Sequence, residues 1–390
     1  MSEKLNYFKF LVKLELDDFN FQSPFNLILP NLKILSLINC HNICLDEIEG
    51  SNTKELIILY STIINKTILK FPKLKKLEYK GNNINFKDII DLTSLTKIKY
   101  LTCEFIYFNY IESASLIKLN LESEEQVIQN INKEIEINVL KKIITSKNLK
   151  TIKSYQIYNI NHEDINNIPG ENTSLEYLDI LFLSEDINCD ILNLQKKFPN
   201  LTELCLKSKY KTNNEEYNKC ELKENPDCEI IKLKIDICGI NIKLSCASFE
   251  NLQILDILIS PGIIDKNFFL IFDDNCSVEF NCLSIFKFGY SNNFEFLENI
   301  SNNLKKMPNL EEICLGFKFA NLNKELYLNC VRKIISYKIS DVYVSFCECI
   351  NLDYYEIKEL EELNFDLNYD YDNIEIQKHM IYENENDYFY

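Results

Sequence analysis

The chain repeats a short pattern in which apolar and polar residues alternate over a few positions. In the segment at residues 32–40, LKILSLINC, the apolar anchors are Leu32, Leu35 and Leu37, and Cys40 occupies the last position. Alternation with a period of two predicts a short strand whose apolar side chains point to one face. One such unit cannot bury that face alone, so the pattern predicts neighbouring copies.

The same pattern recurs along the whole chain. We identify fifteen candidate units, 18 to 33 residues apart, with first anchors at Leu11, Leu32, Leu56, Leu74, Leu95, Leu116, Leu149, Leu175, Leu201, Ile230, Leu252, Leu283, Leu310, Ile339 and Leu360. The units at Leu74, Leu95 and Ile230 fit the pattern best, and those at Leu56 and Leu149 fit it less well. Several units follow a lead-in such as FPKL or FPNL, in which proline favours an extended chain before the strand.

Fifteen units in approximate register, with this shared lead-in, resemble the leucine-rich repeat family over essentially the full length. The resemblance implies an α/β solenoid in the form of a curved horseshoe, with parallel strands on the concave face and helices and loops on the convex face. We expect the solenoid over residues 1–368 and an acidic, tyrosine-rich cap or tail over residues 369–390. The first strand is expected by about residue 11, which leaves no room for an F-box module before it.

The segments between the expected strands change along the chain. Early units leave room only for loops or single helical turns. Apolar residues at helical spacing predict amphipathic helices at residues 124–145, 293–307 and 320–337. The polar segment at residues 207–229 is expected to be a surface loop. Strand followed by helix, repeated, is typical of parallel strands with helices on the other side.

Charge and composition exclude several functional classes. The net charge of −17 and the pI of about 4.8 oppose nucleic-acid binding, which needs a dominant positive field. The amino terminus has lysines at positions 4, 9 and 13 and is not a secretory signal, and no later segment reaches membrane-spanning length. The fifteen cysteines are therefore expected in a reducing compartment. We expect a cytoplasmic monomer that binds neither nucleic acid nor membrane.

Residues that could support catalysis or bind metal are sparse. Cys40, His41 and Cys44 lie close together, but Cys40 already fills the last repeat position and no second pair of ligands follows. Cys205 and Cys314 occupy positions expected to face solvent, yet no histidine stands nearby to activate a nucleophile. Glycine-rich phosphate loops and serine elbow motifs are absent from the sequence. We expect no catalytic, cofactor-binding or metal site, and no enzyme.

Stacking the strands places like charges side by side at the position before the second leucine. The expected strips are Lys76, Lys97 and Lys118 in the first third, and Glu312, Asp341 and Glu362 near the end. Adjacent like charges repel, so stability alone does not favour these strips. One interpretation is that they contact oppositely charged regions of a protein partner. The alternative is that such runs arise by chance, because Lys and Glu are common in this chain.

The resemblance implies a non-enzymatic scaffold that binds a protein partner on its concave face. A second possibility within this class is a substrate-recognition subunit of a ubiquitin ligase or of another multi-chain enzyme complex. Nucleic-acid binding ranks below both, because of the acidic net charge. The sequence does not separate the first two possibilities.

Overall fold

A computed structural model of the chain describes two compact units, each of which is considered by itself. Unit 1 comprises Met1–Leu181 and Asn193–Leu201, and unit 2 comprises Phe182–Leu192 and Thr202–Tyr390. The described residues are 10–20, 27–43, 48–49, 52–62, 67–68, 73–80, 90–91, 98–103, 108, 115–121, 132–157, 160, 162–182, 191–208, 219–221, 229–237, 241–245, 251–259, 269–271, 282–291, 294–318, 324–337, 339–347, 366–370 and 373–379.

Unit 1 is built on a parallel sheet whose strands follow one another in chain order. Leu14 in the first strand pairs with Leu35 in the next, and Leu35 pairs with Leu56 after that. Parallel strands from consecutive repeats are the geometry of a solenoid. The strands are β1 (Lys13–Asp17), β3 (Ile34–Ile38), β5 (Glu55–Leu59), β7 (Lys76–Lys80), β9 (Tyr100–Cys103), β10 (Lys118–Leu121), β11 (Thr151–Ile157) and β12 (Tyr177–Phe182).

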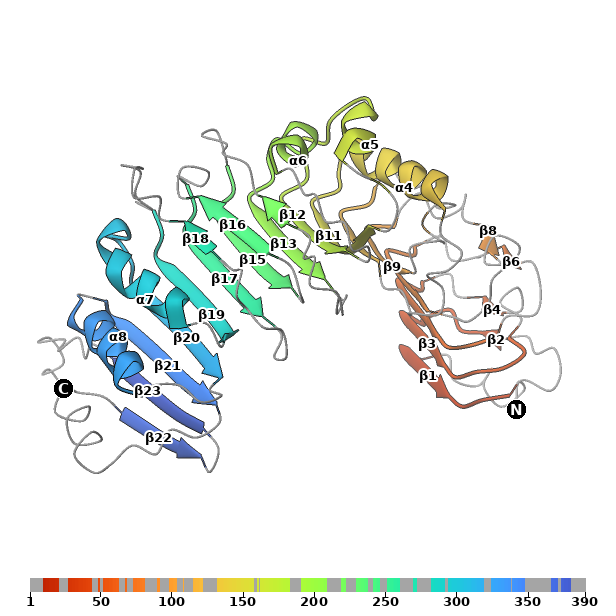
Figure 1. Ribbon diagram of the computed structural model, residues 1–390. Coiled ribbons are helices and arrows are strands. Elements are labelled where there is room, and N and C mark those ends of the chain that lie inside the picture. Colours follow the sequence, from red (N-terminus) through yellow and green to blue (C-terminus); the bar gives the residue numbers. More distant parts are fainter. Residues whose placement is uncertain are drawn as a thin grey trace, which may run out of the picture. The chain divides into compact units, whose positions relative to one another are not determined.

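The connections of unit 1 carry short strands in the early repeats and helices in the later ones. Figure 1 shows the short strands across the unit from β1 and β3. Within them β2 pairs with β4, and β6 pairs with β8. These elements are β2 (Leu27–Ile28), β4 (Ile48–Glu49), β6 (Thr67–Ile68), β8 (Ile90–Asp91), α4 (Lys133–Thr145), α5 (His162–Asn167) and α6 (Ile191–Lys197).

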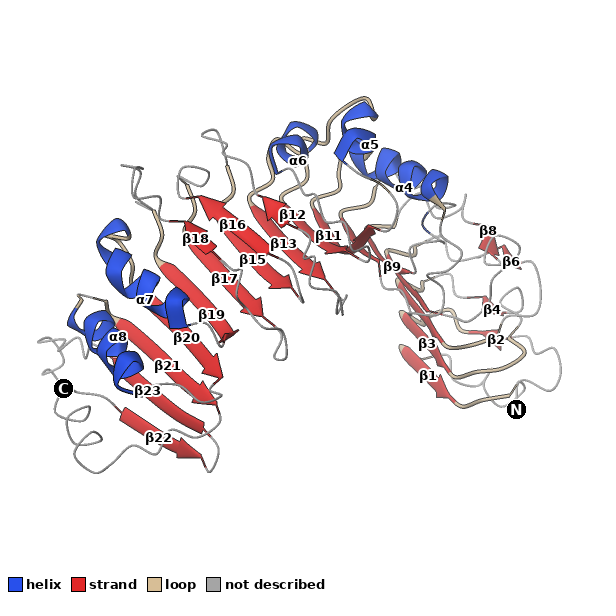
Figure 2. Ribbon diagram, in the orientation of Figure 1, coloured by secondary structure: helices blue, strands red, loops and turns tan. Residues whose placement is uncertain are grey.

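Unit 2 continues the same strand pattern with longer connections. Two helices lie side by side along its sheet (Figure 2), and a second, three-stranded parallel sheet forms in the connections. The main strands are β13 (Glu203–Ser208), β15 (Lys232–Ile237), β17 (Ile254–Ile259), β19 (Ile285–Ser291), β20 (Glu312–Lys318) and β21 (Asp341–Cys347). The connecting elements are β14 (Lys219–Glu221), β16 (Asn241–Ser245), β18 (Phe269–Ile271), α7 (Phe294–Asn303) and α8 (Lys324–Ser336).

The second leucine of each repeat forms a continuous buried row. Leu35, Leu56 and Leu77 are fully buried, and Leu101 and Leu119 continue the row. A buried leucine contributes roughly 1.5–3 kcal/mol to stability, so this row dominates the packing of unit 1. The predicted leucine-rich repeat solenoid is confirmed within each unit by the strand register and this core.

The predicted helices are confirmed where the structure describes them. Helix α4 covers the second half of the range predicted at 124–145, and α7 with a short 3-10 helix at Leu304–Lys306 covers the range at 293–307. Helix α8 covers most of 320–337. The segment at 207–229 was expected to be a loop, but β14 forms within it and pairs with β16. No helix within the described residues is both long and apolar enough to span a membrane.

Two predicted anchors are wrong by three residues. Leu56 pairs with Leu35 and Leu77, so it is the second leucine of its repeat, and buried Thr53 takes the first position. Leu101 pairs with Leu77, so the next repeat begins at Ile98 rather than at Leu95. The prediction failed because Ile and Leu fill several positions of these segments. Burial of the threonine side chain is possible because its hydroxyl lies 3.3 Å from the Leu32 carbonyl oxygen, to which it donates a hydrogen bond.

The carboxy-terminal strands differ from the fifteenth parallel unit predicted at Leu360. Strand β23 (Asn373–His379) pairs antiparallel with β21, and β22 (Asp366–Asp370) pairs antiparallel with β23. Leu360 itself lies outside the described residues. The expected boundary between residues 368 and 369 falls inside β22. An antiparallel hairpin thus ends the parallel register of the described sheet in unit 2.

Candidate functional site

The strands of unit 1 present alternate side chains to the outer face of the sheet. In β7, Leu77 and Tyr79 are fully buried, whereas Lys76, Glu78 and Lys80 are half-exposed. This alternation is the period-two consequence of a strand with one packed face. We call the surface formed by the outward residues of β1 to β11 the strand face of unit 1.

The predicted basic strip is wrong in its register. Lys76 pairs with Tyr100, and Tyr100 pairs with Lys118, so Tyr100 occupies the position assigned to Lys97. Lys97 lies outside the described residues. Lys76 is also close to an acidic neighbour, because its Nζ lies 3.4 Å from Glu55 Oε2. The two described members therefore do not form an uninterrupted basic strip.

The predicted acidic strip is placed correctly for its first two members only. Glu312 and Asp341 are register partners on β20 and β21. The residue in register with Asp341 on the other side is His379 of β23, not Glu362. Glu362 lies outside the described residues. The binding role of all six predicted residues stays a prediction.

Two neighbouring strands carry apolar residues on both faces, a feature that the sequence analysis did not single out. The outward residues of β3 and β5 include half-exposed Ile34, Ile38, Ile57 and Leu59. Ile38 and Leu59 are register partners and lie side by side. Tyr60 directly follows β5 and is 44% exposed. We call these five residues the apolar patch.

Tyr60 has an unusual backbone conformation. Its φ is 51°, in the left-handed region, and its N–H donates a hydrogen bond to the Lys80 carbonyl. Asp18 and Asn39 hold the same place in the two preceding repeats, with φ of 52° and 50°. Asp and Asn tolerate this region, whereas it costs a bulky residue about 1–2 kcal/mol. Local stability therefore does not explain a tyrosine here.

A second feature lies directly before the strands, one position ahead of the predicted strip. Each residue at this position is hydrogen-bonded to its counterpart in the next repeat: the N–H of Lys54 donates to Lys33 O at 2.8 Å, and that of Lys75 to Lys54 O at 2.8 Å. The N–H of Lys99 donates to Lys75 O at 2.9 Å. All four lysines are exposed. We call Lys33, Lys54, Lys75 and Lys99 the lysine row.

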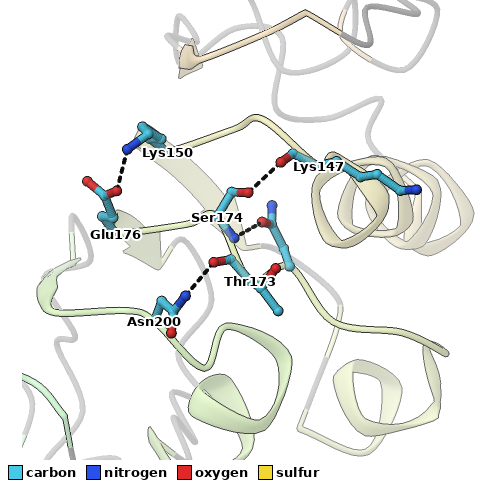
Figure 3. Close-up of polar contacts among 7 residues, drawn as sticks. Lys147, Lys150, Thr173, Ser174, Glu176 and Asn200 are labelled. Atoms are coloured by element: carbon cyan, nitrogen blue, oxygen red, sulfur yellow. Dashed lines mark hydrogen bonds and ion pairs between the residues drawn. The ribbon is translucent and has the colours of Figure 1, made fainter.

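The lysine row ends at Ile117, and a carboxylate enters the same position two repeats later. Ile117 and Lys150 follow Lys99 in this series, and Glu176 follows Lys150. Lys150 Nζ lies 2.6 Å from Glu176 Oε1, as Figure 3 shows. The nearby loop is fixed by Asn200 Nδ2, which donates to Thr173 O at 2.6 Å. A lysine at this position can thus have an acidic neighbour, but the four members of the lysine row form no ion pair with a carboxylate of the described residues.

Two pairs of opposite charges lie on adjacent strands of unit 2. Lys232 Nζ lies 3.7 Å from Glu203 Oε2, and Lys234 Nζ lies 3.4 Å from Asp256 Oδ2. The position that carries the lysine row in unit 1 carries Thr202, Ile231, Gln253, Ser284 and Glu311 in unit 2. The repeat therefore does not require lysine at this position.

The cysteines considered in the sequence differ in how deeply they are buried. Cys205 is buried, contrary to expectation, and Cys314 is half-exposed. Cys40 fills the last repeat position, and burial raises the pKa of its thiol. Within the described residues, no group of three or more His, Cys, Asp or Glu side chains could hold a metal ion. Cys44 lies outside that part of the chain.

The known proteins that resemble this chain are distant from it. No family model matches the chain, and neither does any curated protein. The TLR13 chain in the crystal structure of a TLR13–ssRNA13 complex is 14% identical, over 81% of this chain and 56% of its own, with a TM-score of 0.29. The functional domain of InlJ from Listeria monocytogenes, which includes a cysteine ladder, is 11% identical over 96% of this chain and 81% of its own, with a TM-score of 0.33.

This chain thus spans just over half the length of the TLR13 chain. Similarity at these values carries no argument about this chain. The assignment of leucine-rich repeats depends on the strand register and the buried rows of this protein. A scaffold of this kind is generally a binding domain, and the surface features above are where a partner's chemistry has to be sought.

Proposed function

We propose that the chain is a non-enzymatic scaffold that binds a protein partner on the strand face of unit 1. The observation that carries the proposal is the apolar patch. Four aliphatic side chains stand half-exposed on two adjacent strands, beside an exposed tyrosine in a strained conformation. Apolar and aromatic residues surrounded by charged ones are typical of the centre of a protein interface.

The surroundings of the apolar patch fit that interpretation. Lys76 and Glu55 form an ion pair beside it, and Tyr100, 45% exposed, is the register partner of Lys76 on β9. An aromatic ring supplies a large contact area at a small entropic penalty. A backbone outlier that stability does not explain supports a functional role at that residue.

The experiment compares partner capture by three forms of the full chain. The test variant carries Ile34→Ser and Leu59→Ser. The matched control carries Ile254→Ser and Leu258→Ser, which are half-exposed residues at the same two repeat positions on β17 of unit 2. Neither variant changes the net charge. Each is first tested for unchanged circular dichroism and thermal unfolding.

Proteins captured from cell extract, with and without nuclease treatment, are then quantified by mass spectrometry. We expect a defined set to be lost at least tenfold with the test variant and retained with the control, because truncating interface-centre residues costs about 1–2 kcal/mol. Loss with the control alone would move the site to unit 2 and overturn the proposal. Capture that disappears on nuclease treatment would instead support a nucleic-acid ligand.

The same experiment separates the two forms of scaffold. Co-purification of ligase subunits or of another catalytic subunit in the lost set would identify a substrate-recognition subunit of a multi-chain enzyme. A lost set without such subunits would identify a free-standing binding protein. The proposal includes a cytoplasmic location and a monomeric chain, which fractionation and light scattering of the purified protein test.

A further inference from the structure

We propose that the lysine row, Lys33, Lys54, Lys75 and Lys99, binds an acidic, extended segment of a protein partner. This inference rests on the proposed function and names the chemistry of the partner. The four lysines come from four consecutive repeats and lie at the edge where the strands begin.

The backbone fixes the spacing of the lysine row. Each lysine carbonyl accepts two hydrogen bonds from the next repeat: Lys54 O accepts from the N–H of Lys75 at 2.8 Å and from that of Lys76 at 3.0 Å. Neighbouring members are thus held at the strand spacing of about 4.8 Å. The four positions together extend over about 14 Å.

This spacing selects the form of the ligand. An extended peptide advances about 3.4 Å per residue, so about five consecutive residues match the length of the lysine row. Side chains alternate between the two faces of an extended segment, so three Asp or Glu side chains on one face of it can each approach an ammonium group. A segment of this kind would run across the strands of the sheet, not along them.

The charge distribution of the chain supports a functional role for the lysine row. The chain is acidic overall, with 59 Asp and Glu against 42 Lys and Arg. Even so, the four exposed lysines of the row are neighbours, and none of them forms an ion pair with a carboxylate of the described residues. The same position accepts Glu176 beside Lys150, and it accepts uncharged residues in unit 2. Like charges at this distance repel, so the row is unfavourable until an anion neutralises it.

The lysine row is continuous with the apolar patch. Ile34, a member of the patch, directly follows Lys33. Beyond the patch, the exposed Tyr100 directly follows Lys99. A partner seated on the apolar patch would therefore present its flanking residues to the lysine row. We expect the partner to have apolar residues adjoining an acidic stretch.

The probe is a fluorescein-labelled peptide with five consecutive Asp or Glu residues, measured by fluorescence anisotropy against the full chain. Its partner peptide has Asn and Gln in their place. The test variant carries Lys54→Glu and Lys75→Glu, and Lys54→Gln with Lys75→Gln is a milder second variant. The matched control, Lys232→Glu with Lys234→Glu, makes the same charge change in unit 2, where both lysines have acidic neighbours.

We expect the acidic peptide to bind the native chain and the control, and to bind the glutamate variant at least tenfold more weakly. The glutamine variant should lie between them, and the amide peptide should not bind. Equal affinity for native and glutamate forms would overturn the inference, as would absence of peptide binding to the native chain. Tighter, row-dependent binding of a single-stranded oligonucleotide than of the peptide would also overturn it, in favour of a nucleic acid.

Failure here is distinguishable from failure of the proposed function. A partner set lost with Ile34→Ser and Leu59→Ser but captured fully by the Lys54→Glu and Lys75→Glu form would overturn the lysine row alone. A partner set retained by the Ile34→Ser and Leu59→Ser form but lost with the Lys54→Glu and Lys75→Glu form would remove the apolar patch and retain the lysine row.

Discussion

The backbone N–H of Cys40 donates a hydrogen bond to Ser61 Oγ, 2.9 Å away, and so joins two consecutive repeats. Ser61 Oγ lies 3.2 Å from Leu37 O and 2.9 Å from Leu59 O, either of which can accept its proton. Cys40 Sγ holds the corresponding place one repeat earlier, near Leu16 O and Ile38 O. The last position of the repeat therefore needs a small side chain that both donates and accepts hydrogen bonds.

Ser61→Ala should lower the free energy of unfolding by about 1–3 kcal/mol. The substitution leaves the buried Cys40 N–H without its acceptor, and an unsatisfied buried donor carries that penalty. Ser61→Cys should lose less, because a thiol already serves at this position in the preceding repeat. Urea unfolding followed by circular dichroism measures both changes. An alanine variant as stable as the native chain would contradict this account of the position.

Tyr60→Asn should raise the stability of unit 1 and weaken partner binding. Asn tolerates the left-handed conformation in which Tyr60 is held, and Asn39 adopts it one repeat earlier, so we expect a gain of about 0.5–1 kcal/mol. Loss of the exposed ring removes contact area from the apolar patch. Thermal unfolding and the capture experiment test the two effects separately. A less stable variant would show that the ring packs against the fold.

Sequence periodicity predicted the repeat class and most of the anchors, because apolar alternation directly reflects burial. It failed at Leu56, where Ile and Leu on both faces of β5 erase the contrast between positions. It failed at Leu95 because Leu95, Ile98 and Leu101 recur every three residues, so two registers fit the pattern. The failure at Leu56 also hid the lysine row, because Lys33, Lys54 and Lys75 are 21 residues apart and share a position only once Thr53 is taken as an anchor. The apolar runs of β3 and β5 were visible in the sequence, but which residues face outward follows only from the register.

The antiparallel end was not predictable from the pattern for a different reason. Alternating residues are compatible with either strand direction, and pairing direction depends on the connection. Residues 366–379 contain two strands joined by a connection too short for a parallel crossover, which needs a dozen or more residues. This short connection was a usable signal in the sequence.

Leu77→Ala should lower the free energy of unfolding by about 2–5 kcal/mol. Leu77 is fully buried between Leu56 and Leu101 in the row of second leucines, so its truncation leaves a cavity. Hydrogen exchange measured by mass spectrometry should show the loss of protection centred on β5, β7 and β9. In a solenoid each repeat contacts mainly its neighbours, so β20 and β21 should exchange as in the native chain. Uniform loss of protection over both units would contradict that local effect.

Tyr155→Phe should reduce the loss of stability at alkaline pH. Burial raises the pKa of the Tyr155 hydroxyl well above its ordinary value, and the negative charge of Glu136 on α4 raises it further. Above about pH 10 the unfolded chain therefore releases this proton while the folded chain retains it. The stabilisation associated with Tyr155 is then complete below that pH and is lost as the pH rises further, at up to about 1.4 kcal/mol per pH unit. Urea unfolding of both forms from pH 8 to pH 11 measures the difference, and parallel curves would show that Tyr155 ionises equally in both states.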